Sequence, residues 1–201
     1  MPVKVMLIRH AEKPVGADPP HGVSIDGVAD PESLTPRGWQ RAGALVGLMA
    51  GSFRASGDGQ DAGRTLPTPT HLFASKVGPG SGSRRSLETL EPLADRLGLA
   101  VDTRFLKEEP GPLVAAITAV DGVVLAAWEH RLIPTIATLI LGGPGASPVV
   151  PAVWPDDRFD VVWVFERSDG TPALVFRQLP QLLLSGDRST TIAAGGSAAA
   201  G

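Results

Sequence analysis

The sequence contains no cysteine among its 201 residues, which excludes disulfide bonds, thiolate catalysis and zinc sites built on cysteine. It also has no long hydrophobic run near its beginning. The first apolar stretch, Val3–Ile8, is followed at once by the charged Arg9, and it is too short for the core of a secretory signal or for a membrane span. We therefore expect a cytoplasmic protein.

The chain carries little net charge. Its 18 Lys and Arg residues and 21 Asp and Glu residues give a formal net charge of −3 at pH 7. This value gives no reason to expect nucleic acid or a membrane surface as a partner. A small anionic ligand is still allowed, because a local cluster of arginines can outweigh a weak overall charge. The apolar content of 43% and the length suit one globular domain with a sizeable core.

Apolar runs alternate with turn signals along the chain. Nearly continuous or alternating apolar runs predict strands at residues 3–8, 71–75, 122–128, 160–166 and 173–177, with a short one from Val101. Amphipathic or apolar stretches predict helices at residues 35–49, 84–97, 112–120 and 132–141. Strands that alternate with helices predict a three-layer α/β/α domain with a mainly parallel central sheet.

The predicted domain spans residues 1–188. Residues 189–201 are mostly Ala, Gly, Ser and Thr, and we expect them to form a disordered tail. Two Gly- and Pro-rich loops, 14–34 and 144–157, are the expected specificity loops. Gly78–Gly82 resembles a phosphate loop only superficially, since no Gly-Lys-Ser/Thr follows, and we interpret it as a linker.

Basic side chains follow three of the predicted strands. Arg9 and His10 come after the first strand, Arg84 and Arg85 after the second, and His130 after the strand at 122–128. Because ligands of open α/β sheets bind outside the carboxyl ends of the strands, these side chains are expected to share one site. Several such donors suit an oxyanion with two negative charges.

The arginine pair opens a predicted helix, where the helix dipole disfavours positive charge. A phosphate bound between the helix terminus and a guanidinium would offset that repulsion. The alternative is a pair of solvated arginines at a frayed helix start.

Four short elements occur in a fixed order along the chain. They are Leu-Ile-Arg-His-Ala-Glu-Lys at 7–13, Leu-Thr-Pro-Arg-Gly-Trp-Gln-Arg-Ala at 34–42, Ser75 followed by Arg-Ser-Leu-Glu-Thr at 85–89, and Ala-Trp-Glu-His at 127–130. Together they resemble the histidine phosphatase superfamily, which includes the cofactor-dependent phosphoglycerate mutases and many small phosphatases. The chain is most similar to the phosphatase branch.

This resemblance implies a phosphoglycerate mutase-like fold and a phosphomonoester hydrolase. In this family's chemistry His10 attacks and becomes phosphorylated, while Arg9, Arg85 and His130 hold the phosphoryl group. Water then hydrolyses the phosphohistidine, and neither a metal nor another cofactor is required. The expected partner is a small phosphorylated substrate or inorganic phosphate.

The resemblance also implies a proton donor for the leaving group. Leu106-Lys107-Glu108-Glu109 fits the mutase-like pattern, and we favour Glu108. Glu109 and Glu12 remain alternatives.

Two departures from the family pattern leave questions open. The long stretch 77–83 leaves open whether Arg84 or Arg85 belongs to the site, and Thr89, four places on, favours Arg85. Glu129 stands where the family has a small residue, and its carboxylate should repel phosphate unless it points away or pairs with Arg131.

Other functions stay open on the same residues. One is a catalytically weak or inactive module that binds a phosphate ligand, and another is a phosphohistidine phosphatase that acts on a protein and needs no acidic donor. A mutase is less favoured, because the region before Gly122 lacks the long insert of phosphoglycerate mutases. His21 and His71 lack metal-ligand spacing, and we expect structural or solvent-facing roles for them.

Overall fold

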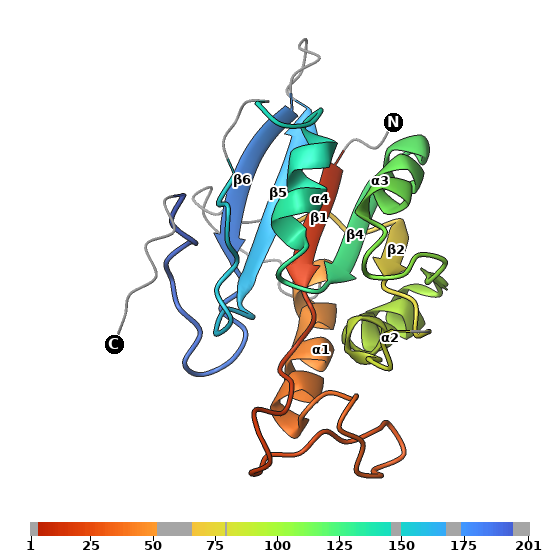
Figure 1. Ribbon diagram of the computed structural model, residues 1–201, viewed down its shortest axis with the longest axis vertical. Coiled ribbons are helices and arrows are strands. Elements are labelled where there is room, and N and C mark those ends of the chain that lie inside the picture. The colour runs from red at the N-terminus through yellow and green to blue at the C-terminus, as the bar shows by residue number, and fades with distance from the viewer. Residues whose placement is uncertain (1–3, 52–65, 79, 146–149, 168–173, 195–201) are drawn as a thin grey trace.

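The structure is a computed structural model that describes residues 4–51, 66–78, 80–145, 150–167 and 174–194. Over these residues the chain forms an α/β fold with one six-stranded mixed sheet and four helices (Figure 1). Within the described ranges, none of the helices has the length and apolar character needed to cross a membrane.

The elements lie close to their predicted places. The strands are β1 (Lys4–Arg9), β2 (His71–Ala74), β3 (Val101–Asp102), β4 (Val123–Trp128), β5 (Val161–Arg167) and β6 (Leu174–Pro180). The helices are α1 (Pro36–Met49), α2 (Arg85–Leu97), α3 (Pro110–Ala119) and α4 (Ile133–Ile140).

The strand order in the sheet is β3-β2-β4-β1-β5-β6. Strands β3, β2, β4 and β1 are parallel, whereas β5 is antiparallel to β1 and β6 is antiparallel to β5. The expectation of a mainly parallel sheet was therefore wrong, and the sheet is mixed. The physical reason is the position of the final strand pair: β5 and β6 form an antiparallel pair, and β5 joins the sheet beside β1 in the opposite direction.

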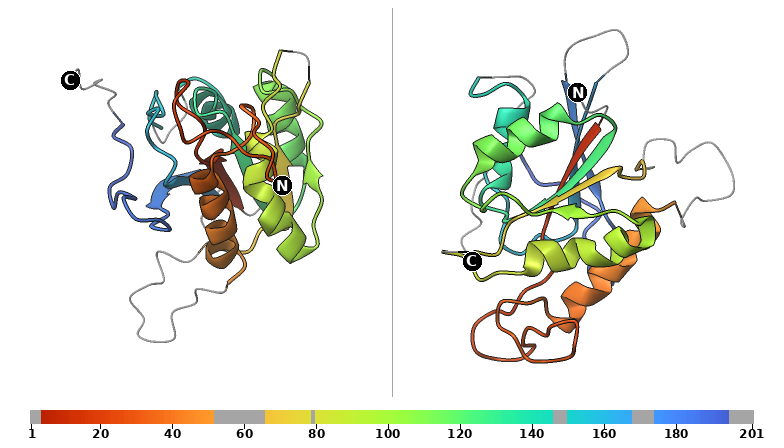
Figure 2. Two further views of the ribbon diagram at one scale, coloured as in Figure 1. Left: turned by 90° about the horizontal axis from the view of Figure 1, so that it is seen from below. Right: turned by 90° about the vertical axis from the view of Figure 1, so that its right-hand side faces the viewer.

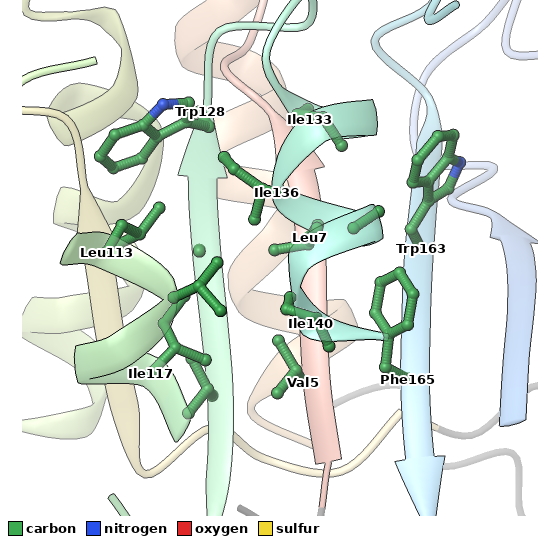
Figure 3. Packing of buried hydrophobic residues seen from close by; sticks show 14 of the residues in the cluster. Val5, Leu7, Leu113, Ile117, Trp128, Ile133, Ile136, Ile140, Trp163 and Phe165 are labelled. Atoms are coloured by element: carbon green, nitrogen blue, oxygen red, sulfur yellow. The ribbon is translucent and has the colours of Figure 1, made fainter. Parts of the chain in front are cut away.

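Each face of the sheet has its own hydrophobic cluster. On one face, Val5 and Leu7 pack with Trp163 and with residues of α3 and α4 (Figure 3). On the other face, Met6 and Ile8 pack with residues of α1 and α2. Figure 2 shows these two helix pairs on opposite sides of the sheet. Because successive strand residues point to opposite faces, burial of both faces explains the nearly continuous apolar run of β1.

Capping residues set the helix limits as the sequence predicts. The Thr35 hydroxyl accepts a hydrogen bond from the Gly38 N–H at 3.2 Å, and Pro36 occupies the first helical position of α1. Helix α2 ends at Gly98, whose φ of 64° is left-handed and favours glycine.

The predicted tail differs from the expectation in its first part. Ile192 is buried, and its backbone N–H donates to Oε1 of Gln178 on β6 at 3.0 Å. The backbone oxygen of Thr190 accepts a hydrogen bond from Arg158 at 2.6 Å. Ile192 and the backbone of Thr190 therefore contact the domain, although residues 189–191, 193 and 194 are exposed, and residues 195–201 lie outside the described residues.

Candidate active site

The carboxyl ends of β1 and β4 lie side by side and face downward in Figure 1. Arg9 pairs in register with Trp128, and the His10 N–H donates to the Trp128 oxygen at 3.1 Å. This pairing of neighbouring parallel strands places His10 next to the loop that carries His130. A cavity of about 210 Å³ opens here, and His10, Arg85 and His130 all line it.

His10 is 5% exposed, and the contact of its Nδ1 atom fixes its tautomer. Nδ1 lies 2.8 Å from the Ala11 carbonyl oxygen. Since a carbonyl oxygen only accepts, Nδ1 carries the hydrogen and Nε2 keeps a free lone pair. The pKa of His10 is lowered from 6.5 to about 3, chiefly by burial and also by the charges of Arg9 and Arg85. His10 is therefore a neutral imidazole near pH 7, as a nucleophile must be.

Arg9 is buried beside His10 and does not line the cavity. Its Nη1 donates to the backbone oxygen of Asp156 at 2.5 Å, and its guanidinium carbon lies 3.8 Å from the centre of the Phe159 ring. Burial lowers the pKa of Arg9 to about 10, so it stays charged at neutral pH. Its Nε and Nη2 atoms are buried without a hydrogen-bond partner among the described residues, which leaves two charged donors unsatisfied.

Arg85, and not Arg84, lies at the cavity. Arg85 donates through Nη2 to the Pro31 oxygen at 2.5 Å, while the Arg84 side chain is exposed and lines no part of the cavity. Thr89 links this helix turn to the segment after β1, because its hydroxyl donates to the Arg85 oxygen at 2.6 Å and accepts from the Ala11 N–H at 2.8 Å.

Nε2 of His130 contacts the carboxylate of Asp156, and this contact is an ion pair only when His130 is protonated. The carboxylate accepts a hydrogen from Nε2, and Nδ1 of His130 is buried without a hydrogen-bond partner in the described part of the chain. Burial and the charge of Arg9 lower the pKa of His130, while Asp156 opposes the shift. Sequence reasoning missed Asp156, since it stands in the 144–157 loop with no motif around it.

Glu129 lines the cavity next to His130. Its Oε1 accepts from Nε of Arg131 at 2.7 Å, so the carboxylate is paired with a neighbouring cation. Pairing with Arg131 reduces the repulsion that the Glu129 carboxylate would otherwise exert on a bound phosphate.

None of the three proposed proton donors lines the cavity. The Glu108 side chain is 59% exposed and lies 3.5 Å from Lys107. Glu109 accepts from the Leu106 N–H at 2.8 Å just before α3. Glu12 is bound by Arg41, with Oε1 and Nη2 2.8 Å apart.

Three further cations line the cavity that sequence reasoning did not assign to the site: Lys13, Lys107 and Arg131. Lys13 lies three residues after His10, and Lys107 is held near β4 because the Trp128 indole N–H donates to its backbone oxygen at 3.0 Å. Burial and the charges of Arg9 and Arg85 lower the pKa of Lys13. The position of Lys13 in the Arg9–Lys13 run was the available signal.

Chemically, the cavity combines one neutral imidazole with several fixed cations. Such a set can bind a dianionic oxyanion and present a nitrogen lone pair to it. In the described ranges, no group of three or more His, Asp or Glu side chains is arranged to hold a metal ion.

Comparison of the sequence with protein-family models and with curated proteins finds no match. The resemblance to the histidine phosphatases therefore depends on the four short elements alone.

Proposed function

We propose that this chain is a phosphomonoester hydrolase of the histidine phosphatase type, with a three-layer, phosphoglycerate mutase-like arrangement. The observation that carries the proposal is the state of His10. Its Nδ1 hydrogen is directed to the Ala11 oxygen, which leaves the Nε2 lone pair available in a cavity that Arg85 and His130 also line. The substrate is a small phosphorylated molecule, and the proposed location is the cytoplasm.

In the proposed first step, Nε2 of His10 attacks phosphorus in line with the ester oxygen. The N–P bond forms while the P–O bond breaks. Arg85 and His130, which line the cavity, stabilise the charge on the transferred group, and the buried positive charge of Arg9 beside His10 adds to their effect. The leaving oxygen takes a proton, for which Glu108 stays the proposed donor.

In the second step water attacks the phosphoryl group, the N–P bond breaks, and inorganic phosphate leaves with His10 restored. No residue in this scheme needs a metal ion, because the arginines supply the positive charge.

A phosphohistidine phosphatase that acts on a protein is the second candidate. It is favoured by the position of the acidic side chains, since Glu108, Glu109 and Glu12 all lie outside the cavity. A phosphoramidate bond breaks without a strong acid, so such an enzyme does not need a carboxylic donor. The third candidate is a module that only binds phosphate ligands. It is favoured by the pairing of His130 with Asp156, because Asp156 occupies the Nε2 donor of His130 that would otherwise bind the phosphoryl group.

Trapping the intermediate tests the proposal. We expect a labelled phosphodonor to leave acid-labile, base-stable label on the wild type and none on His10→Ala. His21→Ala is the matched control, since His21 is exposed and does not line the cavity. Hydrolysis of an aryl phosphate by His10→Ala within about tenfold of the wild-type rate would exclude His10 as the nucleophile.

A further inference from the structure

A second cavity of about 600 Å³ lies beside the candidate active site. Its walls come from the beginning of the 14–34 loop, the start of α1, residues 156–160 and residues 186–188. This volume falls within the range of roughly 300–1,000 Å³ that holds small-molecule ligands in proteins, whereas the first cavity is smaller.

Three contacts join the two cavities. Lys13 lines both of them. Asp156 lines the second cavity and pairs with His130 of the first. Phe159 also lines the second, and its ring centre lies 6.3 Å from that of His10. The two cavities are therefore adjacent, with Lys13 on the walls of both.

The charges of the second cavity are unsuited to an anionic leaving group. Four basic and five acidic side chains line it, and three of the basic ones are arginines already paired with carboxylates of the same walls; the fourth, Lys13, is shared with the first cavity. A second phosphate or a carboxylate on the ligand would meet the excess of acidic side chains. The pairs are Arg37–Glu12, Arg41–Glu12, Arg41–Asp187 and Arg188–Asp157.

The remaining walls are largely apolar. Val15, Pro19 and Pro20 come from one loop, and Phe159 lines the cavity on the side of His10. Val15 is 80% exposed, which is a large exposure for an aliphatic side chain that lines a cavity. A ligand that covered these side chains would remove apolar surface from water.

We infer that the second cavity receives the leaving group, and that the substrates are phosphomonoesters of uncharged, largely apolar alcohols or phenols. This inference depends on the proposed function, because it places the reacting phosphoryl group at His10. It excludes phosphoglycerate-like substrates, whose leaving group carries a carboxylate.

Non-hydrolysable phosphonates test the inference by calorimetry without turnover. We expect benzylphosphonate to bind the wild type at least about tenfold more tightly than methylphosphonate, and phosphonoacetate to bind no more tightly than methylphosphonate. Val15→Asp should reduce the benzyl-to-methyl affinity ratio to near one. Val28→Asp is the matched control, because Val28 belongs to the same loop, is 64% exposed and lines neither cavity.

Each other outcome has a defined meaning. Equal affinity for benzylphosphonate and methylphosphonate, or tightest binding of phosphonoacetate, would overturn the inference even where the phosphoenzyme forms. An equal loss of the ratio in Val28→Asp would also overturn it, because the effect would then come from charge on the loop. Failure of all phosphonates to bind would overturn the inference and the proposed function together, whereas missing phosphoenzyme with normal phosphonate binding would overturn only the hydrolase.

Discussion

The Nδ1 atom of His10 and the carbonyl oxygen of Ala11 lie 2.8 Å apart, and this contact between adjacent residues orients the candidate nucleophile. It depends on the backbone direction at Ala11, whose N–H donates to Thr89 of α2 at 2.8 Å. The tautomer of His10 is therefore set by the fold before any ligand binds, and the helix that presents Arg85 also supports it.

Neighbouring arginines should differ sharply in oxyanion binding. We expect Arg85→Ala to weaken vanadate or phosphate binding about tenfold to a hundredfold, since hydrogen bonds to charged groups contribute about 1.5–3 kcal/mol. Arg84→Ala should bind like the wild type, because the Arg84 side chain is exposed and lines no part of the cavity. The rise of melting temperature with oxyanion concentration measures both affinities. Equal losses in the two variants would mean that their effect is long-range charge.

The proton donor should be identified by its dependence on the leaving group. We expect Glu108→Gln to slow alkyl phosphoesters about a hundredfold, the usual scale for a general acid, and scarcely to affect nitrophenyl phosphate. Glu108 directly follows Lys107, which lines the cavity.

Glu109→Gln and Glu12→Gln are the controls for this comparison of initial rates. If Glu108→Gln slows both substrates equally, Glu108 has a positioning role. If it slows neither and both controls are also unaffected, the leaving group needs no carboxylic donor, and the phosphohistidine phosphatase becomes the better proposal.

Acid should destabilise the wild type through His10. Burial is the main cause that lowers the pKa of His10 from 6.5 to about 3. Between these two pH values His10 is therefore protonated in the unfolded chain and neutral in the folded one. Stability therefore falls as the pH drops from 6.5 toward 3, by at most about 1.4 kcal/mol per pH unit for one proton. Urea titrations at several pH values should show a shallower fall in His10→Gln. Parallel curves for the two proteins would contradict a buried neutral His10.

Two glycines of α1 should respond oppositely to alanine. A Cβ at Gly38 would lie 2.5 Å from the Glu12 backbone oxygen, whereas a Cβ at Gly43 has no neighbour within 4 Å. We expect Gly43→Ala to stabilise the fold by about 0.5–1 kcal/mol through helix propensity. Gly38→Ala should destabilise it by about 1–3 kcal/mol and reduce activity, because it displaces the segment after His10. Thermal unfolding of both variants, with the aryl phosphate assay, checks this prediction, and stabilisation by Gly38→Ala would refute it.

Local signals explain what the sequence could predict. Burial on both faces makes β1 and β4 continuous apolar runs, and a Thr-Pro pair marks the start of α1. Arg9, His10 and His130 could be grouped because parallel strands end at one edge of a sheet.

Contacts between distant residues explain what could not be predicted. The Arg9 contact with the Asp156 oxygen joins residues 147 positions apart. No local sequence pattern around either residue indicates that the two are in contact. The direction of β5 depends on which sheet edge accepts it, and the docking of Ile192 depends on Gln178 of the adjacent strand β6. The exposed position of Glu108 likewise follows from the loop conformation before α3.

The ion pair between Arg41 and Asp187 has a consequence for synthesis of the chain on the ribosome. Asp187 is made 146 residues after Arg41, so the wall that both build stays incomplete while nearly all of the chain emerges. Central strand β1 is also made before either of its neighbours β4 and β5. Until they are made, its backbone N–H and C=O groups have no partner strand. A nascent chain with an open strand edge and an incomplete charge cluster is prone to association with other chains. Completion of this fold therefore has to await the synthesis of Asp187, long after β1 has been made.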